Sequence, residues 1–142
     1  MQLARGRHWE AVAAEYLEDR GLVVLARGRH WEAVAAEYLE DRGLVVLARG
    51  YRCRLGEIDL VCRDARTLVI VEVRARGRTA VARAAESIGP AKRARIIRAT
   101  RHFLMRRSEW RDAPIRFDVV AFDAIDTPDA RVSWLRNAFD AS

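Results

Sequence analysis

Cysteines and long apolar runs are scarce in this sequence. Its two cysteines, Cys53 and Cys62, are too few for a disulfide framework and lack the spacing of a metal-binding motif. We expect Cys62 to pack as a small apolar residue. The N-terminal segment carries several charges and no long apolar core, so neither a signal peptide nor a membrane anchor is predicted. These absences predict a cytoplasmic protein with no membrane partner.

The common short motifs of nucleotide and hydrolase chemistry are also missing. The sequence contains no G-x-G-x-x-G, no P-loop, no G-x-S-x-G and no H-E-x-x-H. Its three histidines stand singly, and lone histidines on helices more often pack or face water than bind a ligand. Chemistry that depends on these motifs therefore has little support.

Positive charge is abundant, and arginine carries nearly all of it. Lys and Arg together number 26 against 20 Asp and Glu, which gives a formal net charge of +6 for 142 residues. A chain of this length has room for one domain with a hydrophobic core. The arginine guanidinium group matches phosphate oxygens in pairs, so a polyanionic partner is favoured. Charge alone does not choose between nucleic acid and another anionic surface.

A perfect tandem repeat opens the chain. The segment LARGRHWEAVAAEYLEDRGLVV occupies residues 3–24 and again residues 25–46. Solenoid repeats diverge and need several units, so a recent duplication is the better interpretation. Only the second copy runs directly into the rest of the chain, which predicts a domain over residues 25–142 and a surplus helix–strand segment over residues 1–24. The apolar face of that segment would cover a neighbouring surface, in the chain or in a homo-oligomer.

The second copy and the residues after it alternate between helical and strand patterns. Apolar residues at helical spacing predict a helix before a strand at residues 44–47. Further strands are predicted at residues 57–63, 67–74, 115–122 and 132–135, and a long helix is predicted to begin near Pro90. One helix before and one within a mixed sheet predict a three-layer α/β/α arrangement. The stripe of the first helix consists of Trp31, Val34, Ala35, Tyr38 and Leu39.

Two carboxylates stand inside the hairpin predicted at residues 57–74. A turn centred on residues 64 and 65 would pair Asp59 with Ile70, and the two-residue period of strands then puts Asp59, Glu72 and Arg74 on one face. The two acids would be diagonal neighbours, roughly 7 to 8 Å apart. Burying them unpaired is costly, so they require a partner. A hard cation such as Mg²⁺ is one candidate, and an ion pair with Arg74 or Arg76, or an exposed face, is the other.

Five segments resemble one family of bacterial proteins. They are GEIDL at 56–60, LVIVEVRAR at 68–76, Lys92, RFDVV at 116–120 and NAF at 137–139. Across residues 28–139 the chain resembles the YraN family, which is similar to restriction-endonuclease-like nucleases and Holliday-junction resolvases of the PD-(D/E)XK group. The resemblance implies a restriction-endonuclease-like fold with a mixed central sheet. It also implies hydrolysis of DNA phosphodiesters, in branched or single-stranded structures, with Mg²⁺ or Mn²⁺ as cofactor.

The resemblance assigns roles by position. It implies that Asp59 and Glu72 are catalytic metal ligands and that Glu32 completes the metal site. The other interpretation of Glu32 is a first-turn carboxylate that complements the positive end of its helix. Arg74 stands where these nucleases carry lysine. Because arginine stays charged, it can orient or stabilise a phosphate but cannot accept a proton.

Three functions remain open at this point. The first is a Mg²⁺-dependent nuclease, and the second is a nucleic-acid-binding module of the same fold without turnover, which the arginine at position 74 favours. The third is a protein-interaction domain whose basic helix is a docking surface. For the first two, DNA is the favoured partner, and the residues expected to contact it are Arg76, Lys92, Arg95 and Arg98.

Overall fold

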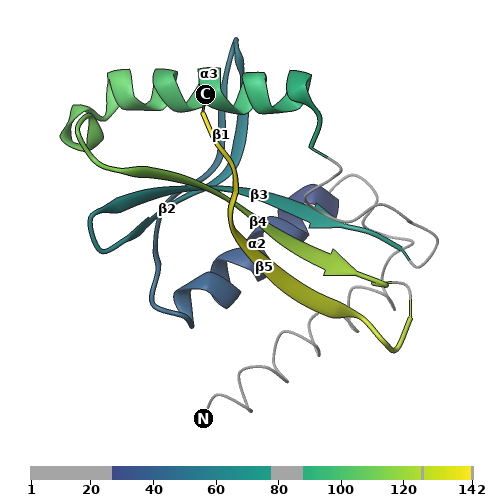
Figure 1. Cartoon of the computed structure of the whole chain (residues 1–142). Coiled ribbons are helices and arrows are strands. Elements are labelled where there is room, and N and C mark those ends of the chain that lie inside the picture. Colours follow the sequence, from purple (N-terminus) through teal and green to yellow (C-terminus); the bar gives the residue numbers. More distant parts are fainter. Residues whose placement is uncertain (1–26, 78–87, 126, 142) are drawn as a thin grey trace.

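The apolar patterns form two helices and one sheet in the computed structural model, which describes residues 27–77, 88–125 and 127–141 (Figure 1). The sheet has the order β1-β2-β3-β4-β5 and is antiparallel except between β3 and β4, which run parallel. The predicted mixed sheet is therefore confirmed, whereas the first repeat copy lies outside the described residues. The elements are α2 (Arg27–Glu40), β1 (Val45–Cys53), β2 (Gly56–Asp64), β3 (Thr67–Ala75), α3 (Pro90–Arg106), a short 3-10 helix η3 (Ser108–Trp110), β4 (Ile115–Asp123) and β5 (Arg131–Phe139).

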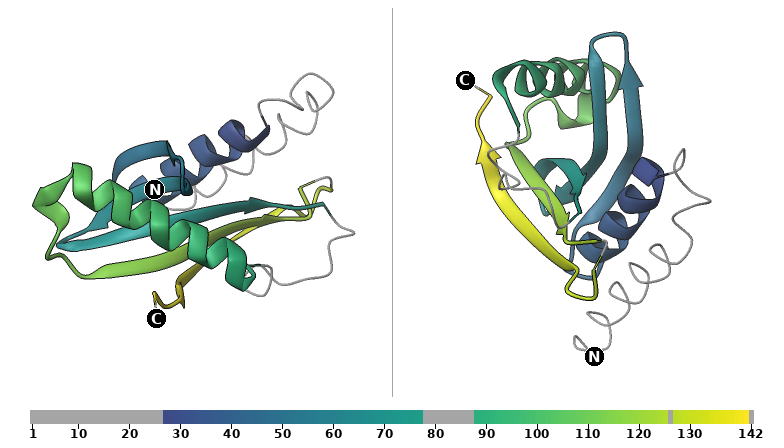
Figure 2. Two further views of the ribbon diagram at one scale, coloured as in Figure 1. Left: turned by 90° about the horizontal axis from the view of Figure 1, so that it is seen from above. Right: turned by 90° about the vertical axis from the view of Figure 1, so that its right-hand side faces the viewer.

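Each face of the sheet carries one helix, with α2 on one side and α3 on the other (Figure 2). Every member of the predicted stripe on α2 is buried, and Trp31 packs against Phe122 of β4 with ring centroids 4.6 Å apart. On α3, Ile96 and Phe103 belong to the core of the opposite face. The result is the predicted three-layer α/β/α arrangement, consistent with a restriction-endonuclease-like fold.

Helix α3 carries charge of one sign only. Pro90 stands in its first turn, where a missing backbone N–H costs nothing. Its sequence, PAKRARIIRATRHFLMR, contains arginines and one lysine but no acid. The buried side of the helix includes Thr100, whose hydroxyl donates a hydrogen bond to the carbonyl of Ile96 at 2.8 Å. Every charged side chain on the exposed side of α3 is therefore basic.

Strand β2 pairs with β1 over nearly its whole length, but it pairs with β3 only from Leu60 to Asp64. The β2–β3 ladder runs from Asp64–Thr67 to Leu60–Val71, while β1 and β2 continue together to Gly56. The predicted pairing of Asp59 with Ile70 is wrong, because Ile70 lies opposite Val61. The turn consists of residues 65 and 66, with a left-handed φ of 54° at Ala65, so it falls later than the pattern indicated. The observed register differs from the predicted one by an even number of residues. Asp59 therefore still lies on the predicted face of the sheet.

Cys62 behaves as the sequence predicts. It is fully buried in the core beneath α2. Burial, followed by the charge of Asp118, raises the pKa of its thiol to about 12. The thiol is therefore unreactive at neutral pH. Among the described residues, no helix is long and apolar enough to span a membrane.

Candidate acidic active site

Asp59 lies where β2 separates from β3, and its side chain fills a gap in the ladder. The backbone N–H of Val73 donates a hydrogen bond of 2.8 Å to Oδ2 of Asp59. In an uninterrupted sheet, that N–H group would bond to a backbone carbonyl of the next strand. The departure of β2 therefore fixes one oxygen of Asp59 against the backbone of β3.

The carboxyl groups of Asp59 and Glu72 are close enough to influence each other strongly. Glu72 is only 6% exposed, and Asp59 is half-buried beside it. Burial raises the pKa of Asp59 to about 9, with further contributions from the hydrogen bond and the negative charge of Glu72. The Val73 N–H acts in the opposite direction, and the charge of Glu32 adds a smaller upward shift. Without a cation between them, the two carboxyl groups carry less than two negative charges.

Lys92, in the first turn of α3, forms an ion pair with Oε2 of Glu72. It is the only lysine in the sequence. Oε2 is buried and accepts no hydrogen bond of normal geometry from the described residues, so the contact is mainly ionic. The sequence predicted Lys92 as a nucleic-acid contact. In this structure its ammonium group contacts Glu72 and its side chain is 39% exposed, so the contact with nucleic acid stays a prediction.

The two arginines of β3 are placed differently with respect to this pair. Arg74 lies two residues beyond Glu72 and therefore on the same face of the sheet, opposite Ala121 of β4. Arg76 follows the end of β3, where its backbone N–H donates to the carbonyl of Phe122 at 2.9 Å. Arg74 is thus the second cationic residue on the face of the acid pair.

Glu32 belongs to α2, which packs on the face of the sheet opposite to α3. Its Oε1 atom would lie 3.7 Å from a Cβ atom placed on Gly50, and its charge acts on Asp59. It borders a pocket of about 430 Å³ that Ala33, Arg49, Gly50 and Arg52 also line. The first turn of α2, which begins at Arg27, contains no acid. The interpretation of Glu32 as a first-turn carboxylate is therefore wrong.

The donor atoms at the site suit a hard divalent cation. Two carboxyl groups in mutual contact offer oxygen ligands, and one of their oxygens is buried without a hydrogen bond of normal geometry. No group of three or more His, Cys, Asp or Glu side chains that could hold a metal ion occurs within the described ranges. The pair of Asp59 and Glu72 would therefore hold such an ion together with water or phosphate oxygens, and the role of Glu32 as a third ligand stays a prediction.

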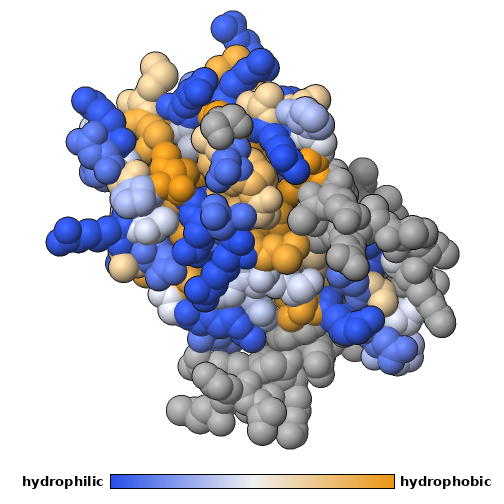
Figure 3. Space-filling model, in the orientation of Figure 1, coloured by the Kyte–Doolittle hydropathy of each residue, from blue (hydrophilic) through white to orange (hydrophobic). Residues whose placement is uncertain are grey.

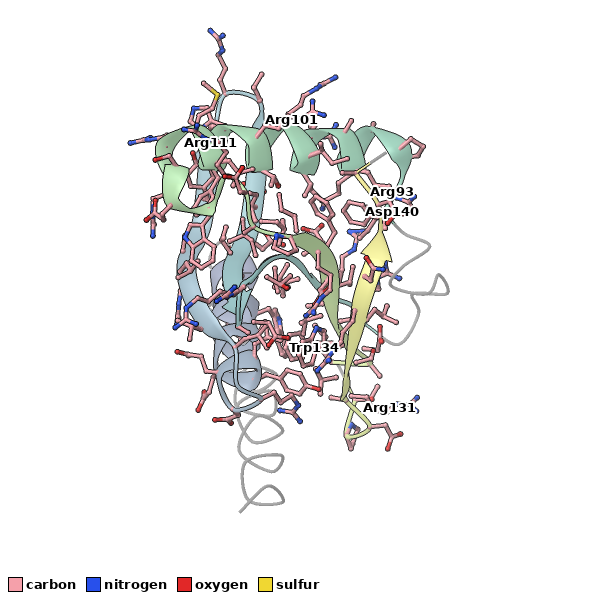
Figure 4. All side chains as sticks on the ribbon, turned by 60° about the vertical axis from the view of Figure 1, so that its left-hand side comes forward. Arg93, Arg101, Arg111, Arg131, Trp134 and Asp140 are labelled. Atoms are coloured by element: carbon pink, nitrogen blue, oxygen red, sulfur yellow. The ribbon has the colours of Figure 1, made fainter. Side chains whose placement is uncertain are left out.

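Arg95 and Arg98, the other predicted nucleic-acid contacts, lie on the exposed side of α3. Arg95 follows Lys92 by about one helical turn, so a basic surface begins beside the acid pair and continues along the helix. Figure 3 shows hydrophilic side chains interspersed with apolar ones along α3 and at the end of the β1–β2 hairpin. Figure 4 shows Arg93 near the start of α3 and Arg101 farther along it.

Asp118 in β4 is a fully buried acid whose role the sequence did not reveal. It accepts hydrogen bonds from Nε of Arg116 at 2.9 Å, from the indole of Trp134 at 2.9 Å, and from the backbone N–H of Asn137 at 2.9 Å. Asn137 has a left-handed φ of 54°. Asp118 therefore fixes β5 to β4 at an irregularity in their pairing and is structural. An acid within the buried run RFDVV was the available signal.

The part of the chain that holds the acid pair also matches a known protein family. Residues 31–122 match the uncharacterised protein family UPF0102, which is the YraN family. A UPF0102 protein of Legionella pneumophila subsp. pneumophila (strain Philadelphia 1) is 41% identical over 141 residues, covering 99% of this chain and 98% of its own. One from Nitrosococcus oceani is 44% identical over 135 residues, covering 95% and 90%. One from Pseudomonas fluorescens (strain Pf-5) is 48% identical over 89 residues, covering 63% and 72%. The chain belongs to the UPF0102 family.

Proposed function

We propose that this protein is a Mg²⁺-dependent nuclease that hydrolyses phosphodiester bonds in DNA. The observation that carries the proposal is the convergence of Asp59 and Glu72 at the point where β2 leaves β3. A sheet rarely places two carboxyl groups in contact unless they share a proton, a cation or both. Beside them lie Lys92, Arg74 and a basic helix, which suit a phosphate-rich substrate.

The ion would be held by Asp59 and Glu72. When bound, Mg²⁺ supplies Lewis acidity to the scissile phosphate and lowers the pKa of an attacking water. Within the chain, the backbone of β3 fixes Oδ2 of Asp59, so this ligand is oriented before any substrate arrives. The ammonium of Lys92 balances the charge of Glu72 at Oε2 as long as no ion is bound.

Lys92 supplies from α3 the ammonium group that position 74 of β3 lacks. Arg74 contributes a permanent positive charge on the same sheet face, which can stabilise negative charge on a phosphate but cannot take up a proton. The two residues therefore divide between them the orienting and charge-stabilising roles that a single lysine fills in similar nucleases.

The test is cleavage of end-labelled linear duplex, single-stranded and four-way-junction DNA, with Mg²⁺ or with a chelator. We expect Mg²⁺-dependent products from the wild-type protein, and a loss of at least about 100-fold in rate for Asp59→Asn and for Glu72→Gln. Asp64→Asn is the matched control, because Asp64 lies on the same strand but pairs with Arg116 at 3.5 Å, at the other end of the hairpin. Unchanged rates in both site variants would exclude the proposal.

One observation favours the second candidate, a nucleic-acid-binding module without turnover. Lys92 already balances the charge of Glu72, so the site does not need a metal ion for electrostatic balance. For this candidate, the wild-type protein would bind DNA with a steep salt dependence but yield no products with Mg²⁺ or Mn²⁺.

A further inference from the structure

The β1–β2 hairpin projects past α3, as Figure 1 and the right-hand view of Figure 2 show. We call residues 53–56 the hairpin tip. Within it, Arg54 and Leu55 are both exposed, and Leu55 retains 47% of its accessible surface. Isolated exposed leucines are common on proteins. Here, however, the leucine stands at the most projecting point of a rigidly held element.

The hairpin tip is fixed against α3 by a close backbone approach. A Cβ atom on Gly56 would lie 2.7 Å from the carbonyl oxygen of Arg95 and 3.2 Å from its Cβ atom, so only glycine permits this packing. Nearer the sheet, the hydroxyl of Tyr51 and Nδ1 of His102 form a short hydrogen bond of 2.5 Å. The ring of Tyr51 also meets Phe103 edge to face, with centroids 5.3 Å apart. These contacts hold the tip in one position.

Exposed arginines stand next to Leu55 in the chain and on the part of α3 against which Gly56 packs. Arg54 precedes it in the tip, and the side chain of Arg95 starts directly beside Gly56. Arg54, Arg95 and Arg98 are exposed, and none has an ion-pair partner in the part of the chain that the structure describes. By contrast, Arg52 pairs with Glu57 at 3.2 Å. One apolar side chain is therefore flanked by unpaired guanidinium groups.

We propose that the hairpin tip is a wedge that inserts Leu55 between bases of a duplex at an end or a strand interruption. Apolar side chains open base stacks in this way when neighbouring cations hold the backbone. Arg54 and Arg95 take the flanking phosphates, and these contacts offset the cost of opening the stack, while the packing of the tip against α3 keeps Leu55 in position. The inference rests on the proposed function for its nucleic-acid substrate. It adds the class of substrate, which is duplex DNA with an accessible break or end.

The experiment measures binding in the presence of chelator, so that cleavage plays no part. The probe is a nicked duplex with 2-aminopurine beside the nick, because the fluorescence of this base rises when it loses its stacking partner. We expect wild-type protein to raise the fluorescence and to bind the nicked duplex more tightly than the intact one. Leu55→Ala should abolish the rise and weaken binding to the nicked duplex by roughly tenfold.

Two variants serve as controls. Leu55→Met keeps an apolar wedge and should restore the fluorescence rise. Met105→Ala removes a larger exposed apolar surface, since Met105 is 81% exposed, but lies about 15 Å farther along α3 than Arg95 and should leave the rise intact. Because Leu55 and Met105 are both exposed, all three variants should have the thermal midpoint of the wild-type protein.

The outcomes separate the wedge from the nuclease. An equal fluorescence rise with Leu55→Ala, or no binding of the probe by the wild-type protein, overturns the wedge. Mg²⁺-dependent cleavage by a protein whose Leu55→Ala variant still opens the stack would overturn the wedge alone. A Leu55-dependent rise in a protein that never cleaves DNA would support the wedge and exclude the nuclease.

Discussion

At Asp59, a carboxyl group remains protonated at a pH where free aspartic acid is ionised. Its pKa is raised above the ordinary value of 3.8, so in the pH range between the two values the folded chain holds a proton that the unfolded chain has lost. Stability therefore falls as the pH rises through this range. Below about pH 4, Asp59 is protonated in both states and has no effect, and above about pH 9 its full cost is reached.

The Asp59→Asn variant tests this coupling. An asparagine reproduces the protonated acid, because its oxygen can accept from the Val73 N–H while its amide donates to Glu72. We expect the variant to be more stable than the wild-type protein at pH 7 to 8 and equal to it near pH 4. Chemical denaturation across this pH range, with chelator present, is the measurement. A wild-type stability that rises with pH as steeply as that of the variant would contradict a shared proton.

Lys92 offers a direct spectroscopic probe, because it is the only lysine in the sequence. Reductive methylation with ¹³C-formaldehyde would give a single lysine signal beside that of the N-terminus. Since Mg²⁺ and the ammonium compete for Oε2 of Glu72, we expect Mg²⁺ to shift this signal in the wild-type protein and not in Glu72→Gln.

The Lys92→Gln variant should bind Mg²⁺ at least as tightly as the wild-type protein, since it lacks the competing charge, yet cleave DNA more slowly by at least about tenfold. Arg107→Gln is the control, because Arg107 lies just past the C-terminal end of α3 and pairs with Glu109 at 3.2 Å. A variant that loses Mg²⁺ binding together with activity would show that Lys92 is needed only to shape the site.

At the scale of single elements, the attachment of β5 to β4 depends on Asp118. Removing this buried acid leaves the guanidinium of Arg116 without its main partner and two further donors unsatisfied. We expect Asp118→Ala to lower the free energy of unfolding by about 3 to 5 kcal/mol. Trp134→Phe removes one of these bonds and should cost less, about 1.5 to 3 kcal/mol. Urea denaturation measures both, with exposed Asp112→Ala as the unaffected control. Equal losses in the two site variants would argue against a shared anchor.

Sequence patterns predicted the elements better than their contacts. The buried stripe of α2, the start of α3 at Pro90 and the strand over residues 115–122 follow from local periodicity, and all three are present. The register of β2 and β3 was wrong because it depends on a left-handed residue, Ala65, that carries no glycine or asparagine signal. The contact between Lys92 and Glu72 joins residues from separate layers, and no local pattern encodes it.

At the scale of the whole molecule, the described residues already cover both faces of the sheet. Helix α2 packs on one face and α3 on the other, so the fold does not require a further helix. Because the two copies are identical, deleting residues 3–24 or residues 25–46 produces the same chain. The experiment therefore tests whether one copy is sufficient.

We expect the single-copy chain to keep a cooperative thermal transition and the circular dichroism of an α/β protein. Deleting both copies, residues 3–46, should abolish folding, since it removes Trp31, Leu39 and their neighbours from the core. Light scattering would show whether the full chain associates and the single-copy chain does not. A single-copy chain that fails to fold would contradict the proposed domain boundary.

The length of the projecting hairpin also fixes the distance between Leu55 and the carboxyl pair. Four positions separate Leu55 from Asp59, which is about 13 Å at roughly 3.3 Å per extended residue. A DNA strand advances about 3.4 Å per nucleotide. A cut made at the carboxyl pair should therefore fall about four nucleotides from the disrupted stack, as sequencing gels of the products would show. Lengthening the hairpin by one residue on each strand adds about 3.3 Å and should move the cut outward by about one nucleotide.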